Sequence, residues 1–165
     1  MALFGLTVGY RNIAIGENSL RCVGCGQCNV AIGRYTGRSI VGPGRGNTLI
    51  GDSAGCNTYT GCANIAIGPW ALPAVCIGSH NIGIGCNSNR VTCGKYNIGI
   101  GYCTLFNVGS SCSNIAIGKD ALMATTANAN IGIGQTTLLY NTSGKYNIAI
   151  GLCALCKQTS GNRNI

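Results

Sequence analysis

The chain has 165 residues, of which 46% are hydrophobic, so it is long enough for one folded domain with a core. Its 27 glycines lack the strict every-third-residue period of collagen, and no apolar run reaches the ~18 residues that a membrane helix needs. Eleven Lys and Arg against three acids give a formal charge of +8, scattered along the chain, which predicts weak attraction to anionic surfaces but no specific nucleic-acid site.

Residues 1–11 precede a set of internal repeats. They lack the basic start and long apolar run of a signal peptide, and we interpret them as part of an N-terminal coil. Residues 12–165 then form the repeats, and the C-terminus falls inside a tenth copy at Asn164-Ile165. Open strand edges invite pairing with another chain, so we expect head-to-tail or lateral association.

A five-residue phrase of the type NIAIG recurs nine times, and successive copies begin about 17 residues apart. A regular period of this kind is typical of a solenoid, in which each coil stacks on its neighbours. We therefore expect an all-β, single-chain parallel β-solenoid of about nine coils of ~17 residues, shaped as a flattened β-roll.

Each phrase is expected to be a short strand. The third residue after the asparagine is always Ile, and we expect these side chains to stack into the core ladder of the solenoid. The members are Ile15, Ile32, Ile50, Ile67, Ile84, Ile100, Ile117, Ile133 and Ile150. The small Ala or Gly between the two apolar residues would then face outward, as a flat surface suited to contact between protomers.

The asparagines are expected to form a second ladder, in which side-chain amides bond from coil to coil. Its members are Asn12, Asn29, Asn47, Asn64, Asn81, Asn97, Asn114, Asn130 and Asn147. The glycine that closes each phrase predicts a corner with positive φ. Leu recurs at a fixed position in the other half of most coils, and we expect a second, looser strand there.

The coil at 135–151, QTTLLYNTSGKYNIAIG, resembles the 17-residue repeat of tail-fibre and surface proteins of phages and other large viruses. The NxAIG phrase is also similar to the head repeats of trimeric autotransporter adhesins. This resemblance covers residues 12–165. It implies a left-handed roll, a virion or extracellular surface location, a possible trimer, and contact with a host surface or glycan.

The 12 cysteines all lie outside the NIAIG phrase. Cys76 and Cys93 are one repeat apart and occupy the same position relative to the asparagines of their coils, so a disulfide between them is a candidate. Cys86 and Cys103, also one repeat apart, are a second candidate pair. An even count fits a fully oxidised set, but connectivity does not follow from sequence.

A metal site is the main rival interpretation of the cysteines. The spacing of Cys22, Cys25 and Cys28 resembles part of an iron–sulfur or zinc ligand set, and Cys56 could supply a fourth ligand. No second cluster accompanies them. Disulfides or free thiols are therefore favoured, and we expect no metal and no cofactor.

Catalytic groups are scarce. The acids are Glu17, Asp52 and Asp120, the only histidine is His80, and no spacing pairs them for acid–base or nucleophilic chemistry. We therefore expect no catalytic residues and no enzyme.

The favoured hypothesis is a self-assembling structural solenoid that forms a fibre, tube or layer with copies of itself. The alternative is a receptor- or glycan-binding module of a trimeric fibre. An ice-binding solenoid ranks third, because the threonines do not align on one face.

Overall fold

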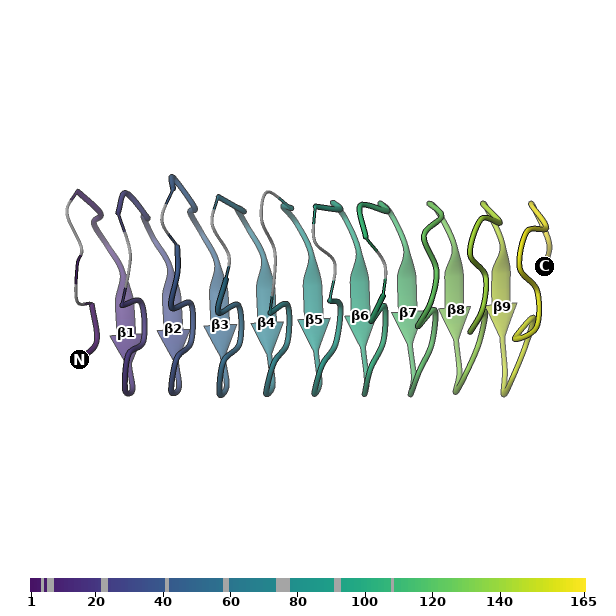
Figure 1. Ribbon diagram of the computed structural model, residues 1–165, viewed down its shortest axis with the longest axis horizontal. Coiled ribbons are helices and arrows are strands. Elements are labelled where there is room, and N and C mark those ends of the chain that lie inside the picture. The colour runs from purple at the N-terminus through teal and green to yellow at the C-terminus, as the bar shows by residue number, and fades with distance from the viewer. Residues whose placement is uncertain are drawn as a thin grey trace.

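Nine short strands form one parallel sheet in the computed structural model, one strand in each coil (Figure 1). The strands are β1 (Ile13–Ile15), β2 (Val30–Ile32), β3 (Thr48–Ile50), β4 (Ile65–Ile67), β5 (Ile82–Ile84), β6 (Ile98–Ile100), β7 (Ile115–Ile117), β8 (Ile131–Ile133) and β9 (Ile148–Ile150). Their order in the sheet is their order in the chain. The predicted all-β parallel solenoid is confirmed.

The structure describes residues 1–3, 5, 8–21, 24–40, 42–57, 60–73, 78–90, 93–107 and 109–165. Within these ranges, no helix is long and apolar enough to cross a bilayer. Equivalent residues of successive coils pair directly, as Ile65 does with Ile82 and Ile67 with Ile84.

The half of each coil that contains the leucines is built from turns, and the predicted second strand is absent from its described residues. Leu20, Leu72 and Leu105 all have φ between 46° and 47°, a left-handed conformation that strands do not adopt. Backbone bonds still run from coil to coil here, for example from the Leu72 N–H to the Ser88 carbonyl at 3.0 Å. The tertiary stacking satisfies these backbone groups without a regular strand.

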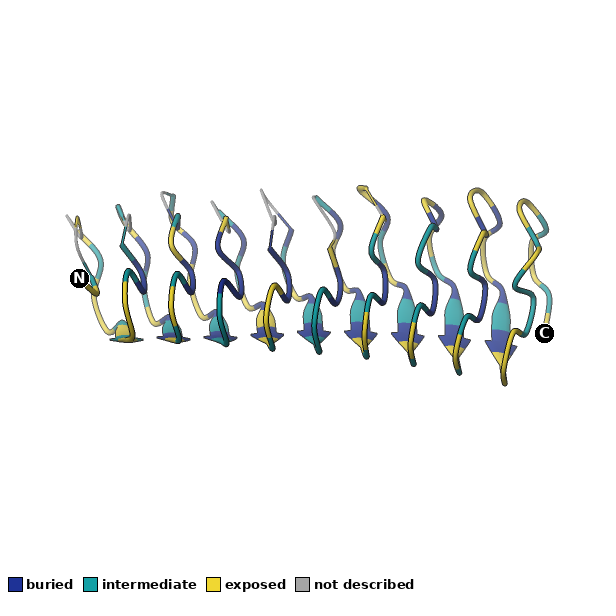
Figure 2. Ribbon diagram, turned by 60° about the horizontal axis from the view of Figure 1, so that its bottom comes forward, coloured by how far each residue is buried: buried dark blue, intermediate teal, exposed yellow. Residues whose placement is uncertain are grey.

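The isoleucine core ladder is the main correction to the sequence analysis. In strands β2 to β9 the middle residue is buried, while the residue on either side is exposed or half-buried (Figure 2). The ladder residues Ile32, Ile67, Ile100, Ile117 and Ile133 each keep 36% of their surface exposed. Ile15 and Ile150 keep 58% and 69%. The ladder exists, but it lies on the outer face of the sheet.

Strand alternation explains this reversal. The asparagine and the residue two positions later share one side of the strand, and the two apolar residues share the other. The asparagines from Asn29 to Asn147 are buried, so the middle Ala or Gly points inward with them. These small residues leave room for the leucines of the opposite half-coil, which are fully buried at Leu20, Leu72, Leu105, Leu122 and Leu138.

The second and third coils show how the side-chain volume inside the solenoid is conserved. Gly37 and Gly55 occupy the position of the core leucine, and Leu49 replaces the usual small residue of the strand. Leu49 is fully buried, and its methyl carbons lie 2.9 and 2.6 Å from where a Cβ on Gly37 and Gly55 would be. A large residue in one layer therefore fills the space that a glycine leaves in the other.

The core is divided into two apolar clusters. One extends from Leu20 to Leu72 and the other from Leu105 to Ala149. Between them the fifth coil carries Asn89 at the leucine position, where its side-chain amide donates to the carbonyls of Ile82 at 2.8 Å and Asn97 at 3.1 Å.

The glycine that ends each strand makes the predicted corner, with φ between 117° and 133°. These glycines also stack on one another. A Cβ on Gly68 would lie 2.9 Å from both the carbonyl carbon and the carbonyl oxygen of Gly85 in the next coil. Both the torsion angle and the close approach of the coils therefore require glycine here.

Candidate interaction surface

The outer face of the sheet consists of the first and third residues of all nine strands, and we call it the Ile face. Apart from Val30 and Thr48, every one of these residues is isoleucine. Nine strands at ~4.8 Å give a length of about 43 Å, and three residues at ~3.3 Å give a width of about 10 Å. The face is therefore an apolar strip of about 430 Å², which is within the size range of the largest, often functional, patches on monomeric proteins.

Exposed aromatic and apolar side chains border the Ile face in sequence. Tyr96 and Tyr146 lie two residues before strands β6 and β9 and are 59% exposed. Tyr102 and Leu152 lie two residues after the same strands and are also exposed. Tyrosine is enriched in protein interfaces, because its ring contributes apolar area and its hydroxyl tolerates water.

The asparagine ladder holds the Ile face in register from behind. Each side-chain oxygen accepts two bonds from the next asparagine, as Asn64 Oδ1 does from the Asn81 backbone N–H at 2.9 Å and Asn81 Nδ2 at 3.3 Å. Nδ2 groups also donate to backbone carbonyls, such as Gly78 for Asn64 at 3.0 Å. The chain of amides runs from Asn12 to Asn164.

A cleft of about 370 Å³ is lined by turn residues that follow strands β2, β3 and β4. Arg34, Tyr35, Arg38 and Trp70 contribute to its lining, and Trp70 is 48% exposed. The Arg34 and Arg38 guanidinium carbons lie 5.1 and 5.6 Å from the centroid of the Tyr35 ring. An exposed indole beside cationic and hydroxyl groups offers both stacking and charge to a ligand.

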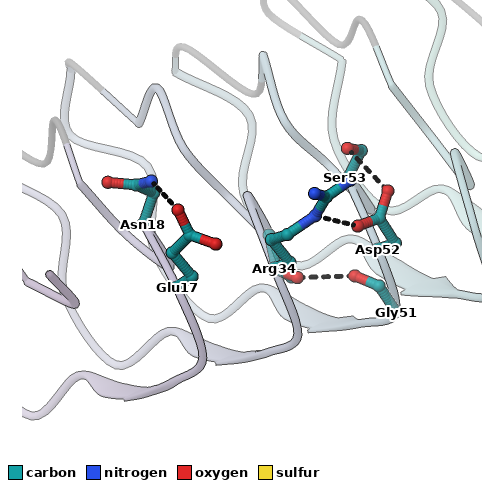
Figure 3. Close-up of polar contacts among 7 residues, drawn as sticks. Glu17, Asn18, Arg34, Gly51, Asp52 and Ser53 are labelled. Atoms are coloured by element: carbon teal, nitrogen blue, oxygen red, sulfur yellow. Dashed lines mark hydrogen bonds and ion pairs between the residues drawn. The ribbon is translucent and has the colours of Figure 1, made fainter.

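Arg34 is held in place by Asp52 of the next coil (Figure 3). Its Nε donates to Asp52 Oδ1 at 2.9 Å, and the hydroxyl of Ser53 donates to the other carboxylate oxygen at 3.1 Å. The hydrogen bond from Arg34 holds the pKa of Asp52 below its ordinary value. In the same view, Glu17 accepts a bond from Asn18 and does not join Asp52.

The candidate catalytic groups do not converge in the described part of the chain. Asp120 lies 4.0 Å from Lys119, and His80 is exposed and stacks on Tyr96 with ring centroids 5.2 Å apart. Neither arrangement pairs two carboxylates or a carboxylate with the histidine.

The candidate metal set is not assembled among the described residues, which hold no group of three or more potential ligands. Cys22 lies outside them. Cys25 and Cys28 are exposed, whereas Cys56 is buried, and burial raises the pKa of its thiol. The Cys56 thiol donates to the Pro73 carbonyl at 3.2 Å.

The candidate disulfides are not formed by the described cysteines, all ten of which are free. Cys76 lies outside the described residues, so its pairing with Cys93 stays a prediction. Cys86 and Cys103 are adjacent along the backbone ladder, and the Cys103 N–H donates to the Cys86 carbonyl at 3.1 Å. However, the repeat from Asn81 to Asn97 is one residue shorter than most, so the two cysteines occupy different positions of the turn.

Two features of this surface were not expected from the sequence: the outward Ile face and the cleft beside Trp70. The sequence does contain a signal for the Ile face. Leu49 stands where the other strands have a small middle residue, and Gly37 and Gly55 stand where most coils have the core leucine. This exchange indicates that the middle residue of the strand belongs to the core.

No known family model, curated protein or solved structure gives a significant match to the chain.

Proposed function

We propose that this protein is a structural building block rather than an enzyme, and that it assembles with copies of itself through the Ile face. The observation that carries the proposal is the strip of isoleucine across nine strands, which no described segment of the chain covers. Water contact with so much apolar surface is unfavourable at ~25 cal/mol per Å². Packing one sheet face on another removes it, as in β-sandwiches.

The occupant of the face is a second copy of the chain. An Ile face of about 430 Å² is roughly half of the ~800 Å² that each partner contributes to a standard interface. The bordering residues Tyr96, Tyr102, Tyr146 and Leu152 add to it, and both sheets present the same ~4.8 Å strand repeat. Two such faces are therefore complementary in length, spacing and chemistry.

Pairing of two Ile faces gives a closed dimer, and head-to-tail stacking of coils would extend such dimers into a fibre, tube or layer. A location on a virion or extracellular surface is part of the proposal, and it is supported by the resemblance of the repeat to surface-protein repeats. The +8 charge opposes association at low salt, since like-charged copies repel one another.

The test is a variant with Ile67→Lys and Ile117→Lys, which places two charges in the middle of the Ile face. Tyr140→Lys is the control, because Tyr140 is 53% exposed but lies outside the strands. Analytical ultracentrifugation at rising concentration and negative-stain microscopy should show assemblies of the native chain and of Tyr140→Lys, but not of the double variant. A native chain that stays monomeric at high concentration and at raised salt would overturn the proposal.

A glycan-binding role is the second candidate, and the cleft beside Trp70 favours it. Aromatic rings stack on the apolar faces of sugars, and Arg38 would attract an acidic one. Trp70→Ala should then abolish binding to a glycan array, while Tyr140→Ala should retain it. Absence of any glycan bound by the native chain would exclude this role.

A further inference from the structure

Cys153 and Cys156 lie at the two ends of one tight turn, in the coil that follows β9. The Cys156 N–H donates to the Cys153 carbonyl at 3.2 Å, which closes a four-residue turn. The end Cα atoms of such a turn are less than ~7 Å apart, close to the ~4.4–6.8 Å that a disulfide spans. Both thiols are free, and Cys153 is exposed.

The surroundings of the two thiols differ. The Thr136 hydroxyl of the preceding coil lies 3.2 Å from the Cys153 sulfur. Hydrogen bonding with Thr136 and with Cys156 holds the pKa of Cys153 below its usual value, and the charge of Lys157 adds to the effect. The bond to Cys153 raises the pKa of Cys156. An exposed thiol that ionises readily, with two residues between it and a second thiol, is the arrangement of exchange-active cysteine pairs.

We propose that Cys153 and Cys156 form a thiol–disulfide exchange site for small-molecule disulfides of the glutathione type. The Cys153 thiolate attacks one sulfur of the small disulfide and breaks its S–S bond. A mixed disulfide forms, and the released thiolate takes up a proton from water. The Cys156 thiolate then attacks the Cys153 sulfur and releases the second small thiol.

The two cysteine thiols are oxidised to one disulfide in this sequence, and the small disulfide is reduced to two thiols. Only the coil after β9 places cysteine at both ends of this turn among the described residues. At the equivalent positions after β6 the chain has Cys103 and Phe106, which cannot close a disulfide. The site does not depend on the assembly proposed above, since its residues lie outside the Ile face.

The experiment uses the reduced full-length chain, treated with glutathione disulfide at neutral pH, alkylated and digested with trypsin. Cleavage after Lys145 and Lys157 gives a peptide, residues 146–157, that contains Cys153, Cys156 and no other cysteine. We expect this peptide to lose two hydrogens and to escape alkylation. The peptide of residues 96–119, with Cys103 and Cys112, is the internal comparator and should not close.

Two variants separate the roles of the thiols. Cys156→Ser should retain one glutathionyl group on Cys153, because nothing resolves the mixed disulfide, and should acquire it at least about threefold faster than Cys103 does. Cys153→Ser should slow glutathione uptake in this peptide by a similar factor. Circular dichroism checks that both variants are folded. The proposal is overturned if the 146–157 peptide is still fully alkylated at a time when the 96–119 peptide has taken up glutathione. It is also overturned if Cys153 reacts with glutathione disulfide no faster than Cys103.

Discussion

A Cβ atom on Gly55 would lie 2.6 Å from Cδ2 of Leu49, in the space that a leucine side chain fills in most other coils. The two residues belong to opposite halves of one coil, one in strand β3 and one in a turn. The usual pair at these positions is a small strand residue and a turn leucine, as in Ala66 and Leu72. Here the large and small residues have changed places, and the interior volume of the coil is preserved.

We predict that Leu49→Ala destabilises the protein by about 2–5 kcal/mol, because it opens a cavity beside two glycines. Gly55→Leu alone should cost about 1–3 kcal/mol, because the new side chain collides with Leu49. The double variant restores the usual pair, and leucine already adopts positive φ at this position in other coils. The double variant should therefore lose clearly less unfolding free energy than the two single variants lose together.

Urea denaturation of the four proteins measures this coupling. Recovery should be partial, since Leu49 also fills the space beside Gly37. Additive losses would contradict the exchange of volume between the two positions.

A second prediction concerns the glycine corner. Gly68→Ala should destabilise the protein strongly, because a Cβ there would lie 2.9 Å from the Gly85 backbone and φ is 119°. Gly151 has nearly the same φ, 117°, but nothing lies within 4 Å of its Cβ position. Gly151→Ala should therefore cost only the torsional strain, and the difference between the melting temperatures reports the contact between coils. Equal losses would show that φ alone selects glycine.

The asparagine ladder provides a third prediction. Asn64→Ala removes the acceptor of two bonds from Asn81 and leaves the buried Asn81 N–H without a partner. The expected loss is about 3–5 kcal/mol of unfolding free energy in chemical denaturation. Asn107→Ala is the control, because that side chain is exposed, and it should change stability by less than ~0.5 kcal/mol. If both variants lost a similar amount of unfolding free energy, the asparagine ladder would not be a specific source of stability.

A fourth prediction concerns pH. The pKa of Asp52 is lowered chiefly by the bond from Arg34, so ionised Asp52 stabilises the fold above the ordinary Asp pKa of ~3.9. That contribution is lost as the pH falls through the lower folded pKa. Arg34→Gln should raise the Asp52 pKa, as measured by carboxyl NMR titration, with little change in stability at neutral pH, because the pair is exposed. An unchanged Asp52 pKa in this variant would show that Arg34 is not the cause.

Much of the architecture follows from the sequence alone. The recurrence of asparagine every ~17 residues predicts the stacked coils and the parallel pairing, and the glycine after each strand predicts positive φ. These features are local or periodic, and the same pattern recurs nine times in one chain, so the prediction does not depend on any single copy.

Which side of the strand faces inward was decided only by the tertiary structure. Alternation separates Ile67 from Ala66 but does not say which is buried, and isoleucine is the more hydrophobic of the two. Burial of Asn64, which needs partners in both adjacent coils, and of Leu72 from the opposite half-coil leaves room inside for alanine only. The placement of Cys153 and Cys156 at the two ends of one turn likewise depends on left-handed backbone angles at Cys153 and Leu155, which no sequence pattern specified.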